Sequence, residues 1–138
     1  MSHVTSPALQ TVHADQSRIG LIALWAVQFA LAGMFLLAGG SKLAGAPAMI
    51  ALFDGIGIGQ WFRYVTGLIE VGSAIALLVP SIAPFGAMAL VATMSGAILT
   101  HLFVVGGSPI VPAVLLVGSL TVAWVRRDHI ASALSRMR

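Results

Sequence analysis

Long apolar stretches, separated by short breaks rich in glycine and proline, make up most of the chain. The first stretch runs from Ile19 to Gly40, and no Asp, Glu, Lys or Arg lies between Glu70 and Arg126. A transmembrane helix needs roughly 20 mainly apolar residues, so the first stretch holds one crossing and the second holds more than two. A helix that begins at Tyr64 and tolerates Glu70 brings the total to four.

The breaks divide these stretches into four expected membrane helices, at residues 18–40, 64–79, 85–105, and from the break at 106–112 to residue 125. Pro80 and Pro84 bracket a short turn that makes the second and third helices an antiparallel pair. The pattern therefore predicts an all-α fold, an integral membrane four-helix bundle.

The connector between the first two crossings, residues 41–63, has a helical pattern of its own. Pro47 suits the first turn of a helix, and Asp54 with Gly55 suits its end. We expect a short extra helix that lies at the membrane interface or folds back into the mouth of the bundle. An aromatic and basic belt at residues 61–64 then marks the start of the next crossing.

Composition supports a location in lipid. Of the 138 residues, 59% are hydrophobic and 8% are charged, whereas soluble domains carry roughly 25% charged residues. A soluble monomer is therefore excluded. The chain has no cysteine, which excludes disulfides, thiol redox chemistry and thiolate metal sites. Three segments are expected: a mobile N-terminal tail at 1–17, the transmembrane domain at 18–127 and a basic C-terminal tail at 128–138.

The basic residues indicate how the chain is oriented. With four crossings, five of the seven lie on the side of both termini, namely Arg18, Arg126, Arg127, Arg136 and Arg138. Lys42 and Arg63 lie on the other side. The positive-inside rule then places both termini in the cytoplasm, and we expect a multi-pass protein of the bacterial cytoplasmic (inner) membrane. Basic residues this scattered do not indicate a nucleic-acid partner.

Small residues are frequent in the predicted helices, where they allow close backbone approach. We expect Gly72 and Gly96 to lie at helix contacts.

Polar side chains at membrane depth supply the candidate site. In the second helix Arg63, Thr66, Glu70 and Ser73 share one face, which we expect to point inward. Glu70 lies roughly 9 Å below the outer interface at helical rise, a depth at which an unpaired carboxylate is costly.

The neighbouring helices bring two further ionisable groups to a similar depth. Lys42 ends a stripe on the first helix that includes Gln28, and His101 lies within about one turn of the depth of Glu70. We predict a polar cluster of Lys42, Glu70 and His101 near the outer mouth of the bundle, with Gln28, Arg63, Thr66, Ser73 and Thr100 as supporting residues. Alternatively, Lys42 snorkels to the interface and His101 is a packing histidine; no metal site is expected.

Four segments, taken in order, resemble the DoxX family in its shorter DoxX-like branch: GGSKLAG at 39–45, FDGIG at 53–57, GLIEVGSAIALLVP at 67–80 and MSGAILTHL at 94–102. The resemblance extends over about residues 18–127. It places the Lys, the second-helix Glu and the third-helix His of the family at Lys42, Glu70 and His101.

The resemblance implies a role in membrane redox chemistry, because the family is named after a membrane subunit of a thiosulfate:quinone oxidoreductase. We expect a small accessory subunit of a quinone-linked system, with quinone as ligand and a membrane oxidoreductase as partner. A single intramembrane carboxylate also fits a small proton-coupled transporter. The absence of a nucleophile with a matched base fits a non-enzymatic interaction or assembly protein. An independent enzyme ranks below these, and a homo-oligomer in the lipid bilayer stays open.

Overall fold

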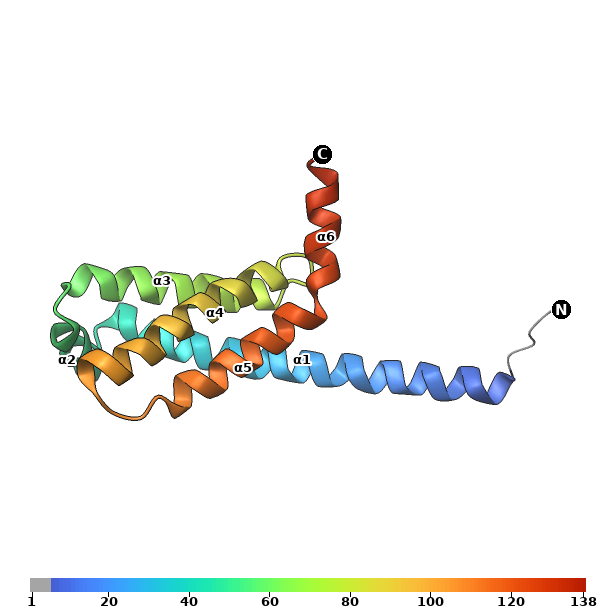
Figure 1. Cartoon of the computed structure of the whole chain (residues 1–138), viewed down its shortest axis with the longest axis horizontal. Helices are drawn as coiled ribbons and strands as arrows, with labels where there is room; N and C mark the ends of the chain where they lie inside the picture. Colours follow the sequence, from blue (N-terminus) through green and yellow to red (C-terminus); the bar gives the residue numbers. More distant parts are fainter. Residues whose placement is uncertain (1–5) are drawn as a thin grey trace.

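The structure is a computed structural model that describes residues 6–138, and every element in that range is helical. The elements are α1 (Pro7–Ala44), α2 (Pro47–Ile56), α3 (Gln60–Leu77), α4 (Ala83–Thr100), the π-helix η1 (His101–Val105), α5 (Ile110–Val125) and α6 (Arg127–Arg136) (Figure 1). The predicted all-α fold is confirmed for this part of the chain.

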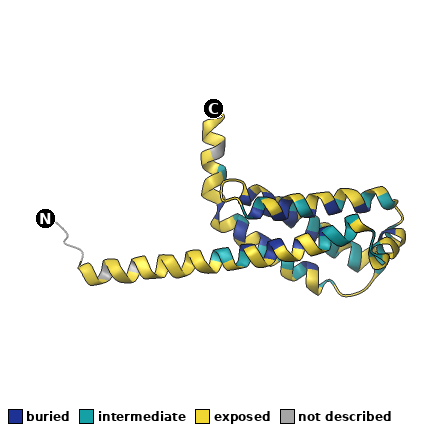
Figure 2. Ribbon diagram, turned by 180° about the vertical axis from the view of Figure 1, so that it is seen from behind, coloured by how far each residue is buried: buried dark blue, intermediate teal, exposed yellow. Residues whose placement is uncertain are grey.

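Four helices lie side by side, with α1 packed mainly on α3, and α4 packed between α3 and α5 (Figure 1). Their shared interior includes the fully buried side chains of Phe35, Leu77, Leu90 and Val122, and Figure 2 shows burial concentrated where the helices face each other. We call the end formed by α2 and residues 106–109 the α2 end. The opposite end, formed by residues 78–82 and the junction at Arg126, is the elbow end.

The short extra helix is present as predicted. Pro47 stands in the first turn of α2, and Gly57 ends the helix with a left-handed backbone at φ 80°. Glycine adopts this conformation without the steric cost that a Cβ brings. The chain can therefore reverse quickly into α3, which begins at Gln60 rather than at Tyr64.

Both terminal segments contain more helix than expected. α1 begins at Pro7 rather than at Arg18, and Figure 1 shows its N-terminal part projecting beyond the bundle. Its 38 residues span about 57 Å at helical rise. Good helix formers such as Ala and Gln sustain a helix there without an apolar face. Residues 1–5 of the predicted tail lie outside the described part. The predicted C-terminal tail lies largely in α6.

The predicted glycine contacts were wrong. A Cβ added at Gly72 or at Gly96 would meet nothing within 4 Å. The close approach of α1 and α3 occurs instead at Gly39 and Gly67, where a Cβ on Gly39 would lie 2.9 Å from the carbonyl oxygen of Gly67. The helices are rich in glycine, as composition indicated, but the direction in which each glycine faces decides whether it contacts a neighbouring helix.

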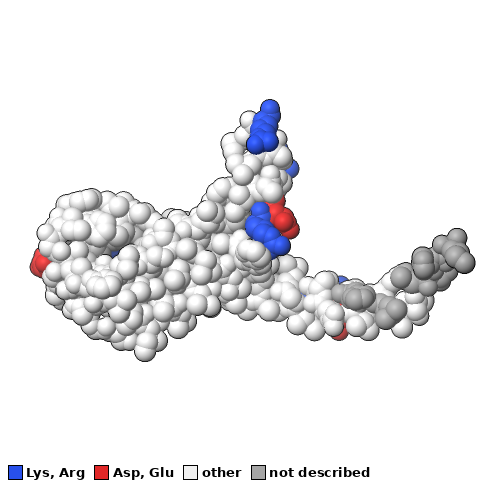
Figure 3. All heavy atoms as spheres, viewed as in Figure 1, with Lys and Arg blue, Asp and Glu red and all other residues white. Residues whose placement is uncertain are grey.

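Two helical segments are long and apolar enough to cross a bilayer, Gln10–Ala44 and Ala83–Val105. A third is obtained if α5 and α6, which meet at a bend of 53°, are counted as one broken span. α3 is not among them, since Gln60, Arg63 and Glu70 lower its mean hydropathy. Large apolar side chains such as Leu37 and Phe103 cover the outside of the bundle, and in the view of Figure 3 charged atoms are few over the helices. This exterior is that of a helical membrane protein.

Candidate functional site

A buried ion pair connects α1 and α3 near the α2 end. Lys42 Nζ donates to Glu70 Oε2 at 2.7 Å, and only 14% of the Lys42 side chain and 2% of the Glu70 side chain are exposed. Two of the three residues of the predicted cluster therefore meet directly. Snorkelling of Lys42 to the interface, the alternative interpretation, does not describe this conformation.

The two glycines of the α1–α3 contact lie next to this pair. Gly39 and Gly67 are both buried, and a Cβ on Gly39 would also lie 3.0 Å from Glu70 Cβ. Since neither residue carries a side chain, the two backbones come close at the level of Glu70. This close approach lets the Lys42 side chain, on the next turn of α1, reach the carboxylate.

Arg63 adds a second buried cation at the same end. Its side chain is 4% exposed, its Nη1 donates to the carbonyl oxygen of Lys42, and its guanidinium lies 4.3 Å from the centre of the Tyr64 ring. The carbonyl groups of the last turn of a helix lack partners within that helix. Arg63 therefore completes the C-terminal end of α1 and fixes the backbone that carries Lys42.

A chain of hydrogen bonds links this group to the protein surface. Arg63 Nε donates to Gln60 Oε1 at 2.6 Å, and Gln60 Nε2 donates to Asp54 Oδ1 at 2.7 Å. Asp54 is exposed on α2. Sequence reasoning did not select Gln60 or Asp54, although Gln60 precedes Arg63 by three residues and so lies on the same helical face.

Four other predicted site residues form no hydrogen bond with the ion pair in the described part of the chain. His101 Nδ1 lies 2.8 Å from the carbonyl oxygen of Ala97, and Thr100 and Thr66 also bond to carbonyl oxygens of their own helix. Ser73 is buried in α3. In the described part of the chain, no hydrogen bond or ion pair joins His101 to Lys42 or Glu70. Membership of His101 in the cluster stays a prediction.

Gln28 does not support the ion pair; it belongs to a second polar group at the elbow end. Its Nε2 donates to the carbonyl oxygen of Leu77 at the end of α3, and its Oε1 accepts a 2.8 Å hydrogen bond from Arg126 Nε. The Arg126 guanidinium lies 5.3 Å from the centre of the Trp25 ring. Each end of the bundle thus contains a buried arginine beside an aromatic ring.

The DoxX-like family matches residues 26–125. This chain belongs to the DoxX-like family. No curated protein and no solved structure matches the chain.

The matched region of the DoxX-like family includes the whole α2 end but not all of the elbow end. Lys42, Glu70 and His101 lie well inside residues 26–125, whereas Trp25 and Arg126 lie just outside them. The buried ion pair is thus a feature of the matched DoxX-like region.

The ion pair has chemical properties suited to a polar head group. An ammonium group donates up to three hydrogen bonds, and a carboxylate accepts them. The end of the bundle also has an aromatic surface, because Phe62 lies 5.9 Å from Phe53 and 5.7 Å from Trp61 between ring centres.

Proposed function

We propose that this DoxX-like protein is a small accessory subunit of a membrane redox system and binds a quinone head group at the α2 end. The observation that supports the proposal best is the buried Lys42–Glu70 pair near the α2 end, the end of the bundle that also contains the rings of Phe53, Trp61 and Phe62. In the proposed complex the Lys42 ammonium donates to a quinone carbonyl, and Glu70 accepts from the hydroxyl of the reduced form. The redox centre belongs to a partner oxidoreductase.

The membrane arrangement that goes with this proposal has four crossings, formed by α1, α3, α4 with η1, and α5. α3 contains Arg63 and Glu70, whose charges are shielded inside the bundle, where both side chains are almost fully buried. The α2 end then faces the outside of a bacterial cytoplasmic membrane, and both termini are cytoplasmic. The excess of Lys and Arg at the terminal side supports this orientation.

Cysteine labelling tests the orientation. Ser108, Ser81 and Ser132 are exposed, and the chain has no cysteine of its own, so each Ser→Cys variant carries a single reactive thiol. In intact cells an impermeant maleimide should label Ser108→Cys alone, and all three variants should react after the cells are opened. Labelling of Ser132→Cys in intact cells would contradict the proposed orientation.

Tryptophan fluorescence tests quinone binding, because the three tryptophans divide between the two ends. Trp61 lies at the α2 end, while Trp25 and Trp124 lie beside Arg126 and Arg127 at the elbow end. In a Trp25→Phe, Trp124→Phe chain, a short-chain ubiquinone should quench Trp61 saturably. Adding Glu70→Gln should weaken this binding about tenfold, since hydrogen bonds to charged groups contribute about 1.5–3 kcal/mol.

The matched control keeps Trp124 and replaces Trp25 and Trp61 by Phe. Its quenching should rise linearly with the quinone that dissolves in the micelle, without saturation. Equal quenching of both chains, or equal binding by the Glu70→Gln chain, would contradict a quinone site at the α2 end. The partner is tested by purification of the tagged protein from its native membranes in mild detergent, where a flavin- or haem-containing oxidoreductase should co-purify.

A second candidate function is a small proton-coupled transporter. The carboxylate of Glu70 favours it, because this side chain is almost fully buried in α3 and a proton can neutralise it there. Vesicles loaded with a pH-sensitive dye distinguish the two functions. A transporter would dissipate a pH gradient in the presence of its substrate, and a Glu70→Gln chain would not, whereas a quinone-binding subunit leaves the gradient unchanged.

A further inference from the structure

The elbow end contains an arginine that is held in place but forms no ion pair within the described part of the chain. Arg126 stands between α5 and α6, with 7% of its surface exposed. Gln28 orients it, because the amide nitrogen of Gln28 is bonded to the carbonyl oxygen of Leu77 and its amide oxygen therefore points at Arg126 Nε. Trp25 covers the guanidinium at 5.3 Å. Three helices thus contribute to holding this one cation.

The donors of Arg126 are not all satisfied. Its Nη2 is buried and has no hydrogen-bond partner, and the ion pair found in the described part of the chain is Lys42–Glu70, at the other end. A guanidinium does not lose its proton in proteins, and a buried charge without a partner is costly. Such a cation is expected to have an anionic partner that does not come from this chain.

The surroundings of Arg126 identify the level of the membrane at which the partner is found. Arg127 lies 4.4 Å from the centre of the Trp124 ring, so two arginine–tryptophan contacts mark this end. Tryptophan and arginine gather at the height of the lipid head groups. The anions available there are the phosphates of phospholipids, which arginine binds through two parallel N–H groups.

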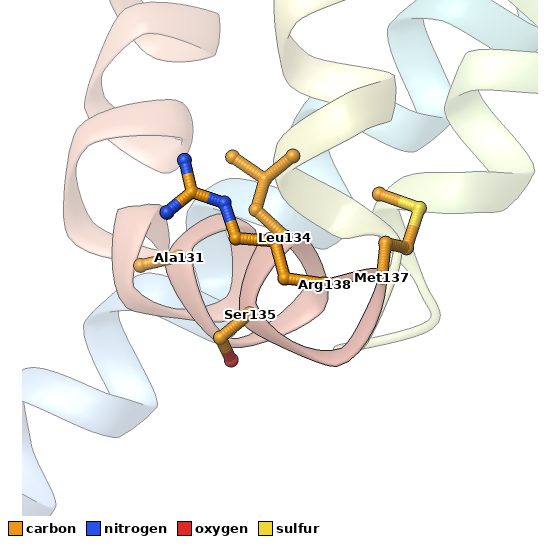
Figure 4. A pocket seen from close by; sticks show the side chains of 5 residues that line it. All are labelled: Ala131, Leu134, Ser135, Met137 and Arg138. Atoms are coloured by element: carbon orange, nitrogen blue, oxygen red, sulfur yellow. The ribbon is translucent and has the colours of Figure 1, made fainter.

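The helix that follows the elbow is suited to the same surface. α6 bends away from α5 by 53°, and apolar side chains recur at spacings of four and three residues at Ile130 and Leu134 on α6 and at Met137, its C-cap. Leu134, Met137 and Arg138 line a hollow of about 490 Å³, and Figure 4 shows their side chains as sticks. An amphipathic helix with basic residues lies in the plane of an anionic membrane surface. Its position keeps the elbow at head-group height.

We propose that Arg126, oriented by Gln28, binds the phosphate of an anionic membrane phospholipid at the elbow end of the bundle. The phosphate supplies the missing charge at the guanidinium, whose Nη2 has no hydrogen-bond partner in the described part of the chain. Because Leu77 and Gln28 connect the same group to α3 and α1, the bound lipid also stabilises the contact between these helices and α5.

Native mass spectrometry of the full-length chain tests the site, with phosphatidylglycerol, phosphatidylcholine of identical acyl chains, and inorganic phosphate as probes. Phosphatidylglycerol should bind most tightly, and Arg126→Gln should weaken it about tenfold, as expected for a lost charged hydrogen-bond partner. Arg127→Gln, the matched neighbour whose guanidinium lies over Trp124, should change the affinity by less than about a third of that factor.

A second variant keeps the test decisive if Arg126→Gln does not fold. Gln28→Glu provides an internal carboxylate at the atom that already accepts from Arg126 and removes the donor to the Leu77 carbonyl oxygen, so this chain should be less stable and should lose its preference for phosphatidylglycerol. Equal affinity for phosphatidylglycerol and phosphatidylcholine would overturn the proposal. Binding of inorganic phosphate as tightly as phosphatidylglycerol would overturn the lipid as its source. An unchanged lipid preference in the Gln28→Glu chain would also overturn it.

Discussion

Glu70→Gln and Lys42→Met should each lower the free energy of unfolding by about 3–5 kcal/mol, whereas the double substitution should recover part of this loss. Removing one member of the pair leaves the other buried without a counter-charge, because the Glu70 carboxylate is 2% exposed and the Lys42 ammonium lies 2.7 Å from it. Removing both members leaves two uncharged side chains of similar size. The coupling energy of the cycle measures the interaction directly.

Equilibrium unfolding of the four proteins in mixed micelles gives the measurement. Asp54→Asn is a suitable control, because Asp54 is exposed and accepts a hydrogen bond that an amide oxygen can also accept; it should change the stability by less than about 0.5 kcal/mol. A coupling energy near zero would mean that Lys42 interacts with solvent or lipid in the membrane. The quinone proposal would then retain only Glu70 as its polar contact.

The ion pair could be predicted from the sequence because three constraints together restrict where the two side chains can lie. Glu70 had to be shielded at its depth, its spacing from Thr66 and Ser73 set the inward face, and Lys42 ended a stripe on the preceding helix. The all-helical fold and the short helix α2 followed from apolar length and from Pro47 in the same manner. In each case the local sequence makes the alternative structures energetically costly, so that one structure remains.

Contacts between distant segments could not be predicted in this way. Gln28 and Arg126 are 98 residues apart, and nothing in either local pattern indicates that α1 and the α5–α6 junction meet. Gln28 was placed with the ion pair because it shares a stripe with Lys42, but 14 residues separate the two, or about 21 Å along a helix. A stripe defines a face of a helix, and it does not say which end of the bundle a residue reaches.

The helix-contact glycines show the same limit, since composition marks them all alike while the packing distinguishes them. Gly39 faces α3 with its neighbour Gly67, and Gly72 faces outward from the same helix pair. Gly39 and Gly72 can therefore be compared to measure the effect of close helix packing. A Gly→Ala substitution made at each position separates the cost of overpacking from the higher helix propensity of alanine.

Gly39→Ala should destabilise the protein by about 1–3 kcal/mol, as overpacking does in a closely packed interior. Its Cβ would lie 2.8 Å from Val71 Cγ2 and 2.9 Å from the carbonyl oxygen of Gly67, and backbone atoms cannot move aside as the end of a flexible side chain can. Gly39→Leu should cost more, because separating α1 from α3 also stretches the Lys42–Glu70 pair.

Gly72→Ala, its matched control, should leave stability unchanged or raise it by up to about 1 kcal/mol, since alanine is the better helix former. Unfolding in mixed micelles measures both, and quinone quenching of Trp61 should weaken in Gly39→Ala but not in Gly72→Ala. Equal stability of the two variants would contradict the α1–α3 contact at Gly39 and Gly67. The ion pair would then have to form across a wider gap between α1 and α3. Across such a gap the Glu70 carboxylate would no longer be shielded between the two helices.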